Sequence, residues 1–214
     1  EQPGSPAGRR ALASTWREAG LPTLFVVVFG TVFAFSAFEQ TYAIFAEDRL
    51  GLTTKTIGYS LALVGVIVMI VQGALIRPVS QKVAERSILQ SATLLVAVGF
   101  ALLSFARGWG LLIPSLVLLA AGQGFLSPTL TSVISARIEP TRRGAVLGVQ
   151  QSWSAMARVV GPLTAGFLFD HVSSVAPMVS AAVLFVVTAV LSIGAVRPRA
   201  VDSALEQQPL RVGS

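Results

Sequence analysis

The sequence contains no cysteine among its 214 residues, which excludes disulfide bonds, thiolate metal sites and cysteine nucleophiles. Charge is also scarce, because Asp, Glu, Lys and Arg together make up 12% of the chain, whereas soluble domains carry about 25%. The one histidine, His171, is interpreted as a solvated loop residue. No phosphate-binding glycine loop, zinc-ligand spacing or Ser/His/Asp arrangement occurs, so neither an enzyme activity nor a cofactor is expected.

Apolar residues, by contrast, are abundant and occur in long runs. Hydrophobic side chains make up 53% of the chain. The runs between charged clusters reach about 18 residues or more, the length that a helix needs to cross a hydrocarbon core of about 30 Å. The six predicted spans cover approximately residues 21–46, 56–76, 88–106, 111–136, 145–169 and 176–196. The sequence therefore predicts an all-α membrane protein whose six transmembrane helices form one bundle over residues 21–197.

The distribution of Lys and Arg predicts the orientation of these spans, since cytoplasmic loops carry an excess of both. Twelve lie on one side of the predicted membrane and three on the other. The first side holds Arg9, Arg10, Arg17, Arg77, Lys82, Arg86, Arg137, Arg142, Arg143, Arg197, Arg199 and Arg211, and the second holds Arg49, Lys55 and Arg107. We therefore expect a multi-pass protein of the cell (inner) membrane with both termini in the cytoplasm, and no nucleic-acid partner.

Polar segments flank the predicted bundle. Residues 1–20 are expected to be a cytoplasmic linker, in which Arg9–Ala19 forms either a short basic helix at the membrane surface or a disordered segment. Residues 198–214 are expected to be a disordered cytoplasmic tail. The chain begins with Glu1 and shows no signal-peptide pattern, so a fragment or a trimmed product is expected.

Polar side chains are concentrated in the first, second, fourth and fifth spans, while the third and sixth hold only scattered Ser and Thr. This rhythm predicts a 3+3 repeat in which the first two helices of each repeat face a cavity, as in secondary transporters. The predicted substrate and ion pathway consists of polar residues in these four spans, namely Glu39, Gln40, Gln72, Gln123, Ser127, Gln151, Ser154 and Arg158. In the fourth span, Gln123, Ser127, Thr131 and Ser135 recur at intervals of four and form one stripe.

Glu39 and Arg158 are the ionisable residues inside predicted spans. A charge at a helix centre costs about 2.5–3.5 kcal/mol on insertion scales, so such residues normally face protein or water. Their predicted depths in the membrane differ by about 6 Å at 1.5 Å per residue, which two long side chains can bridge. In one interpretation Glu39 binds a proton or a cationic substrate, and Arg158 adjusts its proton affinity or attracts anions. In the other, the two form a fixed ion pair that joins two helices.

Glycine and proline inside the fourth and fifth spans predict bent helices, because proline removes a backbone donor and clashes with the preceding turn. The residues predicted to serve conformational change are Gly124, Pro128, Gly161, Pro162 and Gly166. The alternative is ordinary packing, since both residue types are common in membrane helices.

Several stretches resemble the C-terminal six-helix half of major facilitator superfamily transporters, in particular the bacterial drug and sugar efflux group. The similar stretches are Phe38–Thr41 with Arg49–Leu52, then Gly58, Gly65 and Gln72-Gly73, and lastly Arg142–Pro162. Within the last, Ala157-x-x-x-Gly161-Pro162-x-x-Ala165-Gly166 is similar to the antiporter motif, with Ala in place of Gly at both ends. That motif belongs to the fifth helix of the family, so antiport and symport both stay open.

The resemblance implies one half of the fold of these transporters, and secondary active transport of a small molecule by proton-coupled efflux. In this family, substrate binds between two six-helix halves that rock to expose it alternately. The implied partners are the lipid bilayer, a small-molecule substrate, protons, and either an N-terminal six-helix half or a second copy of the chain. Two alternatives stay open: a six-helix protein that transports as a homodimer, and a membrane scaffold or assembly subunit that does not transport.

Overall fold

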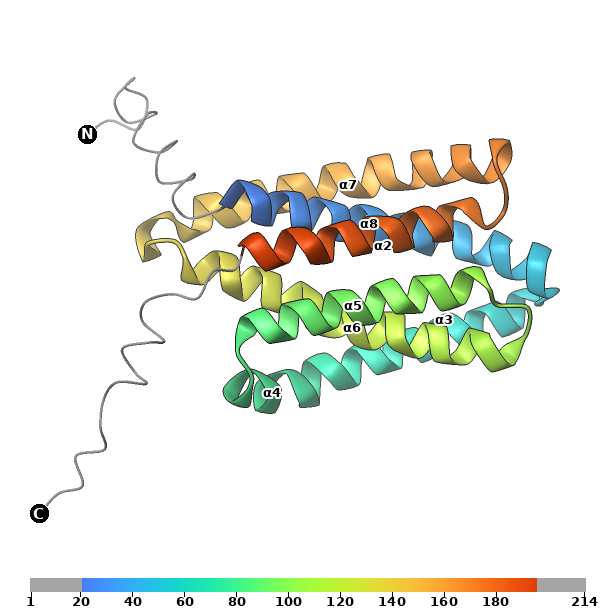
Figure 1. The fold of residues 1–214 in the computed structure, drawn as a ribbon, viewed down its shortest axis with the longest axis horizontal. Helices are drawn as coiled ribbons and strands as arrows, with labels where there is room; N and C mark the ends of the chain where they lie inside the picture. Colours follow the sequence, from blue (N-terminus) through green and yellow to red (C-terminus); the bar gives the residue numbers. More distant parts are fainter. Residues whose placement is uncertain (1–20, 196–214) are drawn as a thin grey trace, which may run out of the picture.

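The computed structural model describes residues 21–195, with side chains up to Leu191, and the described residues contain helices and no strand. The predicted linker (1–20) and tail (198–214) lie outside the described residues. In chain order the elements are α2 (Leu21–Leu50), α3 (Thr54–Ile70), the π-helical turn η1 (Val71–Leu75), α4 (Ile76–Lys82), α5 (Glu85–Ser104), α6 (Trp109–Ala136), the 3₁₀ turn η2 (Pro140–Arg142), α7 (Arg143–His171) and α8 (Ala176–Ala195). Figure 1 shows these helices running side by side along one long axis.

Each predicted apolar stretch lies almost wholly within one long helix, with α3, η1 and α4 together forming the second. Short connections separate them. Gly51 ends α2 with a left-handed φ of 62°, a conformation that glycine adopts without steric cost. Two residues later the Thr53 side chain caps α3 by accepting a hydrogen bond from the Thr56 amide at 3.5 Å. The apolar runs therefore become helices where the sequence places them.

Four helical segments are long and apolar enough to cross a membrane, namely Leu21–Leu50, Thr54–Lys82, Glu85–Ser104 and Trp109–Ala136. The described apolar part of α8, Ala176–Leu191, is shorter. The 29-residue α7 is long enough but is interrupted by polar side chains such as Gln151 and Arg158. The prediction of an all-α membrane protein is confirmed.

The helices pair across the two predicted repeats rather than only within them. α7 packs along α2 and α3 packs along α6, whereas α2 barely contacts α3 and α6 barely contacts α7, although these are neighbours in sequence. α5 and α8 pack on each other between these pairs. In Figure 1, α7 and α3 accordingly lie at opposite edges of the bundle.

This pairing has an internal two-fold pattern. Exchanging α2 with α6, α3 with α7 and α5 with α8 turns the α2–α7 contact into α6–α3 and the α2–α8 contact into α6–α5, while α5–α8 maps onto itself. Because each repeat has an odd number of helices, the second repeat runs with inverted topology. The arrangement matches the predicted 3+3 repeat.

The core forms where α2, α5 and α8 meet. Phe100 of α5 lies edge-on to Phe38 of α2, with ring centroids 5.6 Å apart, and stacks on Phe185 of α8 at 5.5 Å. All three rings are at most 2% exposed. α5 and α6 approach even more closely, because a Cβ added at Gly122 would lie 2.8 Å from the Ala92 carbonyl oxygen. Small residues at such contacts let membrane helices pack backbone to backbone.

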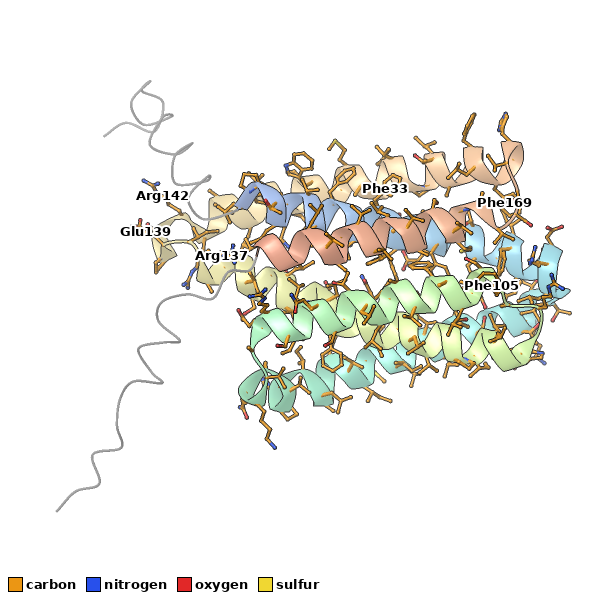
Figure 2. The ribbon with its side chains drawn as sticks, in the orientation of Figure 1. Phe33, Phe105, Arg137, Glu139, Arg142 and Phe169 are labelled. Atoms are coloured by element: carbon orange, nitrogen blue, oxygen red, sulfur yellow. The ribbon has the colours of Figure 1, made fainter. Side chains whose placement is uncertain are left out.

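The two ends of the bundle differ in charge. The connections after α4 and α6 lie at one end in Figure 1, and those after α2, α5 and α7 lie at the other. Figure 2 shows Arg137, Glu139 and Arg142 at the first end. Among the described residues, that end carries Arg77, Lys82, Arg86, Arg137, Arg142 and Arg143, and the opposite end carries Arg49, Lys55 and Arg107.

Candidate substrate and ion pathway

Glu39 and Arg158 lie at neighbouring positions on the paired helices α2 and α7. The Ser36 hydroxyl, one turn before Glu39, donates to the backbone carbonyl of Arg158 at 3.4 Å. The Arg158 guanidinium is close enough to act electrostatically on the Glu39 carboxylate. The part of the chain that the structure describes includes no direct ion pair between the two. The fold therefore brings these residues together across 119 positions of sequence, as their predicted depths suggested.

Both charged side chains are exposed on the surface of this bundle. Arg158 is the sixteenth of the 29 residues of α7 and Glu39 the nineteenth of the 30 residues of α2, so both lie near the middle of long helices. A charge at that depth costs about 2.5–3.5 kcal/mol against lipid. The surface that carries Glu39 and Arg158 is therefore unsuited to lipid and suited to water or to another polar protein surface.

The stripe predicted on α6 is partly exposed on this bundle. Ser127 and Thr131 are exposed, and the Thr131 hydroxyl accepts a hydrogen bond from the Gln150 side chain of α7 at 3.2 Å. Gln123 is half-buried, and its Oε1 is buried with no hydrogen-bond partner among the described residues. A buried acceptor without a donor costs about 1–3 kcal/mol, so this position favours an incoming donor. Gln150, one residue from the predicted Gln151, is a polar contact that the predicted pathway did not include.

The remaining carboxamides of the predicted pathway are exposed and come from three helices. They are Gln40 in α2, Gln72 in the π-turn after α3, and Gln151 in α7. Ser154 differs from them because it is 7% exposed. It lies on the buried stripe by which α7 packs against the bundle. Most of the surface of α7 is exposed, including the side chains of Gln151 and Arg158.

Small residues on α7 set its close contact with α2. The buried positions from the middle of α7 onward are Ser154, Ala157, Gly161 and Ala165. A Cβ added at Gly161 would lie 2.6 Å from the Phe33 carbonyl oxygen. The residues that resemble the antiporter motif thus include the small positions that bring the two backbones together. Figure 2 labels Phe33 on α2, the helix beside α7.

The other predicted conformational residues have different surroundings. Gly124 is buried, and a Cβ there would lie 2.8 Å from Val71 of η1. Pro128 and Pro162 are half-buried within helices that continue past them to Ala136 and His171. Gly166 has open space where a Cβ would stand. A π-turn occurs in the second helical segment of the described residues, at Val71–Leu75, shortly before Pro78.

A buried hydrogen bond between Tyr42 and Ser60 links α2 to α3, at 2.7 Å. Ser60 donates its own proton to the Ile57 carbonyl, so Tyr42 is the donor to Ser60. Sequence reasoning missed this pair, because a tyrosine and a serine 18 positions apart give no local signal. Since α2 and α3 otherwise touch only slightly, the bond is their main polar connection among the described residues.

Replacing Tyr42 with Phe is expected to lower the free energy of unfolding by about 1 kcal/mol, because one buried hydrogen bond is lost without a change of shape. Unfolding by sodium dodecyl sulfate in mixed micelles, followed by circular dichroism, measures this. Tyr59→Phe is the matched control, since Tyr59 is 65% exposed. Equal stability of the two variants would show that the Tyr42–Ser60 bond contributes nothing.

The described residues contain no group of three or more His, Asp or Glu that could hold a metal ion. The polar side chains of this surface are carboxamides, hydroxyls, one carboxylate and one guanidinium. They can bind donors, acceptors and a proton, and they offer no nucleophile paired with a base. The arrangement fits recognition and passage of a solute rather than covalent chemistry.

Comparison with known proteins gives a family match. Residues 73–211 match the model of the Major Facilitator Superfamily. The class G tetracycline resistance protein of Vibrio anguillarum is 34% identical over 145 residues, which cover 67% of this chain and 36% of that protein. Multidrug resistance protein 2 of Bacillus subtilis is 25% identical over 148 residues, covering 68% of this chain and 36% of that protein.

Solved structures give the same assignment of fold. The human organic anion transporter MFSD10 superposes with a TM-score of 0.72 and 26% identity, over 79% of this chain and 40% of that one. A peptide transporter POT superposes with a TM-score of 0.74 at 18% identity, which supports the fold alone. This chain therefore spans little more than a third of the length of the curated relatives it matches.

Proposed function

The chain belongs to the Major Facilitator Superfamily, and from that premise we propose that it is the C-terminal half of a proton-coupled transporter that exports a small molecule. Membrane transport is the activity of this family.

The main support for this proposal is that the charged side chains of Glu39 and Arg158 are exposed on the surface of the bundle. Two charges near the middle of long helices lie on the outside of the described bundle, where lipid would be costly. The exposed Ser127 and Thr131 on α6 and Gln151 on α7 add further polar groups. A second six-helix bundle facing this surface would enclose it as a water-accessible pathway, with substrate bound between the two.

The proposed coupling ion is the proton. Glu39 is a carboxylate beside a cation, and a carboxylate in this setting can take up and release a proton during each transport cycle. No phosphate-binding glycine loop is present in the sequence, which favours an ion gradient over ATP as the energy source. Efflux is proposed because two of the relatives are named as tetracycline and multidrug resistance proteins.

The proposed orientation places the α4–α5 and α6–α7 connections in the cytoplasm of a cell with an inner membrane. The excess of Lys and Arg at that end supports it. At that end Arg142 ends η2 and Arg143 begins α7, and Arg77 and Lys82 lie on α4. Both chain termini would then be cytoplasmic.

Two other arrangements lead to different results in a transport assay. A second copy of the chain could supply the missing bundle, in which case the chain alone would transport. A scaffold would not transport with any partner. The half-transporter proposal predicts a third result, no transport alone and transport after a six-helix N-terminal half is added.

The test uses purified chain in phospholipid vesicles with an imposed pH gradient, with tetracycline and ethidium as probes. The N-terminal half is taken from the coding sequence immediately upstream, where the proposal predicts six spans in the same frame or in an adjacent gene. Gradient-driven accumulation is expected only with both halves. Accumulation by the chain alone would contradict the half assignment, and no accumulation by a correctly inserted pair would contradict efflux of these compounds.

A further inference from the structure

The regular bonding of α3 is interrupted once, by the π-turn Val71–Leu75. There the Ile76 amide donates to the Val71 carbonyl, five residues earlier, instead of the four of an α-helix. π-turns are rare in helices and frequent at functional sites. The turn contains Gly73 and is followed by Pro78 in α4, which has no amide to donate to the Ala74 carbonyl four residues earlier, so a proline and a π-turn coincide here.

Val71 in this turn is the last buried residue of the segment Thr54–Lys82, whose other buried residues are Ile57, Ser60 and Val64. Val71 is 2% exposed and fits against Gly124 of α6, where a Cβ would come within 2.8 Å of its Cγ1. Every residue after it, from Gln72 to Lys82, is exposed or half-buried, and α4 contains no buried residue. α4 packs closely only on the π-turn itself. Figure 1 shows α4 at the edge of the bundle, beside the end of α5.

We propose that the π-turn is a hinge, with Val71 seated against Gly124 as its pivot, about which residues 72–82 move relative to the bundle. Gln81 lies about 15 Å beyond Val71 at 1.5 Å per residue. A change of about 20° in the kink angle, the size of a sharp kink, therefore moves Gln81 by about 5 Å. The moving segment carries Arg77 and Lys82 at the basic end of the bundle.

The hinge is a property of this chain and does not depend on its substrate or on a partner half. Its consequence for a transporter is that the segment Thr54–Lys82 divides at Val71 into a part fixed on α6, which is α3, and a part free to change its distance from the other helices. Gln72 and Gly73 stand at the point of division, and a Cβ at Gly73 would meet nothing within 4 Å. The hinge can therefore be altered there without disturbing the packing.

Distances between pairs of spin labels test the hinge, and the absence of cysteine lets each pair be placed uniquely. One pair joins exposed Gln81 of α4 to exposed Gly148 of α7, at the same end of the bundle. The control pair joins exposed Ala62 of α3, before the π-turn, to Leu163 of α7. Electron–electron double resonance on the purified chain is expected to give a distance distribution about 5 Å broader for the first pair than for the second.

Two variants separate a hinge from a loose helix end. Deleting Gly73 removes the extra residue of the turn, and Gly73→Ala stiffens it, so both are expected to narrow the Gln81–Gly148 distribution. Gly65→Ala is the matched control, because its Cβ also meets nothing within 4 Å, and it should leave the distribution unchanged. Equally narrow distributions for both label pairs, or equal effects of Gly73→Ala and Gly65→Ala, would overturn the proposal. Gly73→Ala keeps the chain length, so the test stands if the deletion variant does not fold.

Discussion

Replacing Glu39 with Gln in the complete transporter is expected to lower transport driven by a pH gradient by at least about tenfold, because a carboxamide cannot take up or release a proton. Exchange of labelled for unlabelled substrate across the membrane, which needs no net proton movement, is expected to remain. This second readout distinguishes loss of coupling from loss of folding. Both are measured in vesicles over a range of pH.

Glu47→Gln is the control for that experiment. It makes the same chemical change on the same helix, at an exposed position eight residues nearer the end of α2, and should leave gradient-driven transport unchanged. Gradient-driven transport by Glu39→Gln equal to that of the unaltered protein at every pH would rule out Glu39 as the proton site. The interpretation of Glu39 and Arg158 as a fixed structural pair would then be preferred.

Replacing Gly161 with Ala is expected to destabilise the bundle by about 1–3 kcal/mol, the usual cost of overpacking, and Gly161→Val by more. The reason is that the new Cβ would lie 2.6 Å from the Phe33 carbonyl oxygen and 3.4 Å from the Ala37 amide nitrogen. Both are backbone atoms of α2, a helix of 30 residues of which 15 are buried, so it has little room to shift.

Unfolding in mixed micelles measures this loss, and the fluorescence of Trp153, isolated by replacing Trp16 and Trp109 with Phe, reports where it occurs. The Trp153 ring lies edge-on to Phe29 of α2, with centroids 5.7 Å apart, so separation of α7 from α2 should shift its emission. Gly166→Ala is the control on the same helix, because its Cβ would meet nothing within 4 Å. Equal stability of the Gly161→Ala and Gly166→Ala variants would contradict close α2–α7 packing at this position.

The positions of the helices could be predicted from the sequence because they depend on local composition. Whether a run of apolar residues between charged residues is long enough to cross a membrane can be counted directly. Gly51 ends α2 and Thr53 begins α3 through local backbone conformation and hydrogen bonding. The polarity of α2, α6 and α7 is also local information. That Glu39 and Arg158 lie at similar depths followed from counting residues from the helix ends.

The pairing of helices could not be predicted in this way, because it depends on contacts between distant residues. No local pattern places Phe33 against Gly161 or Tyr42 beside Ser60. The π-turn Val71–Leu75 was not predicted, and the Val71–Gly124 contact beside it is a feature of tertiary packing. Ser154 was included in the predicted pathway with Gln151 and Arg158, and packing of α7 against the bundle buries it.

The reaction of introduced cysteines with a charged, membrane-impermeant thiol reagent tests the central claim most directly, namely that the polar surface of α2 and α7 lines a water-accessible pathway. Thiols react as thiolates, which form in water and not in lipid. Single cysteines are placed at Gln40 and Gln151 on that surface, and at Leu94 of α5 and Val183 of α8 as exposed apolar controls. In membranes containing both halves of the transporter, we expect Gln40→Cys and Gln151→Cys to react at least about tenfold faster than the controls. Reaction of all four positions at the same slow rate would show that this surface faces lipid and would contradict the account.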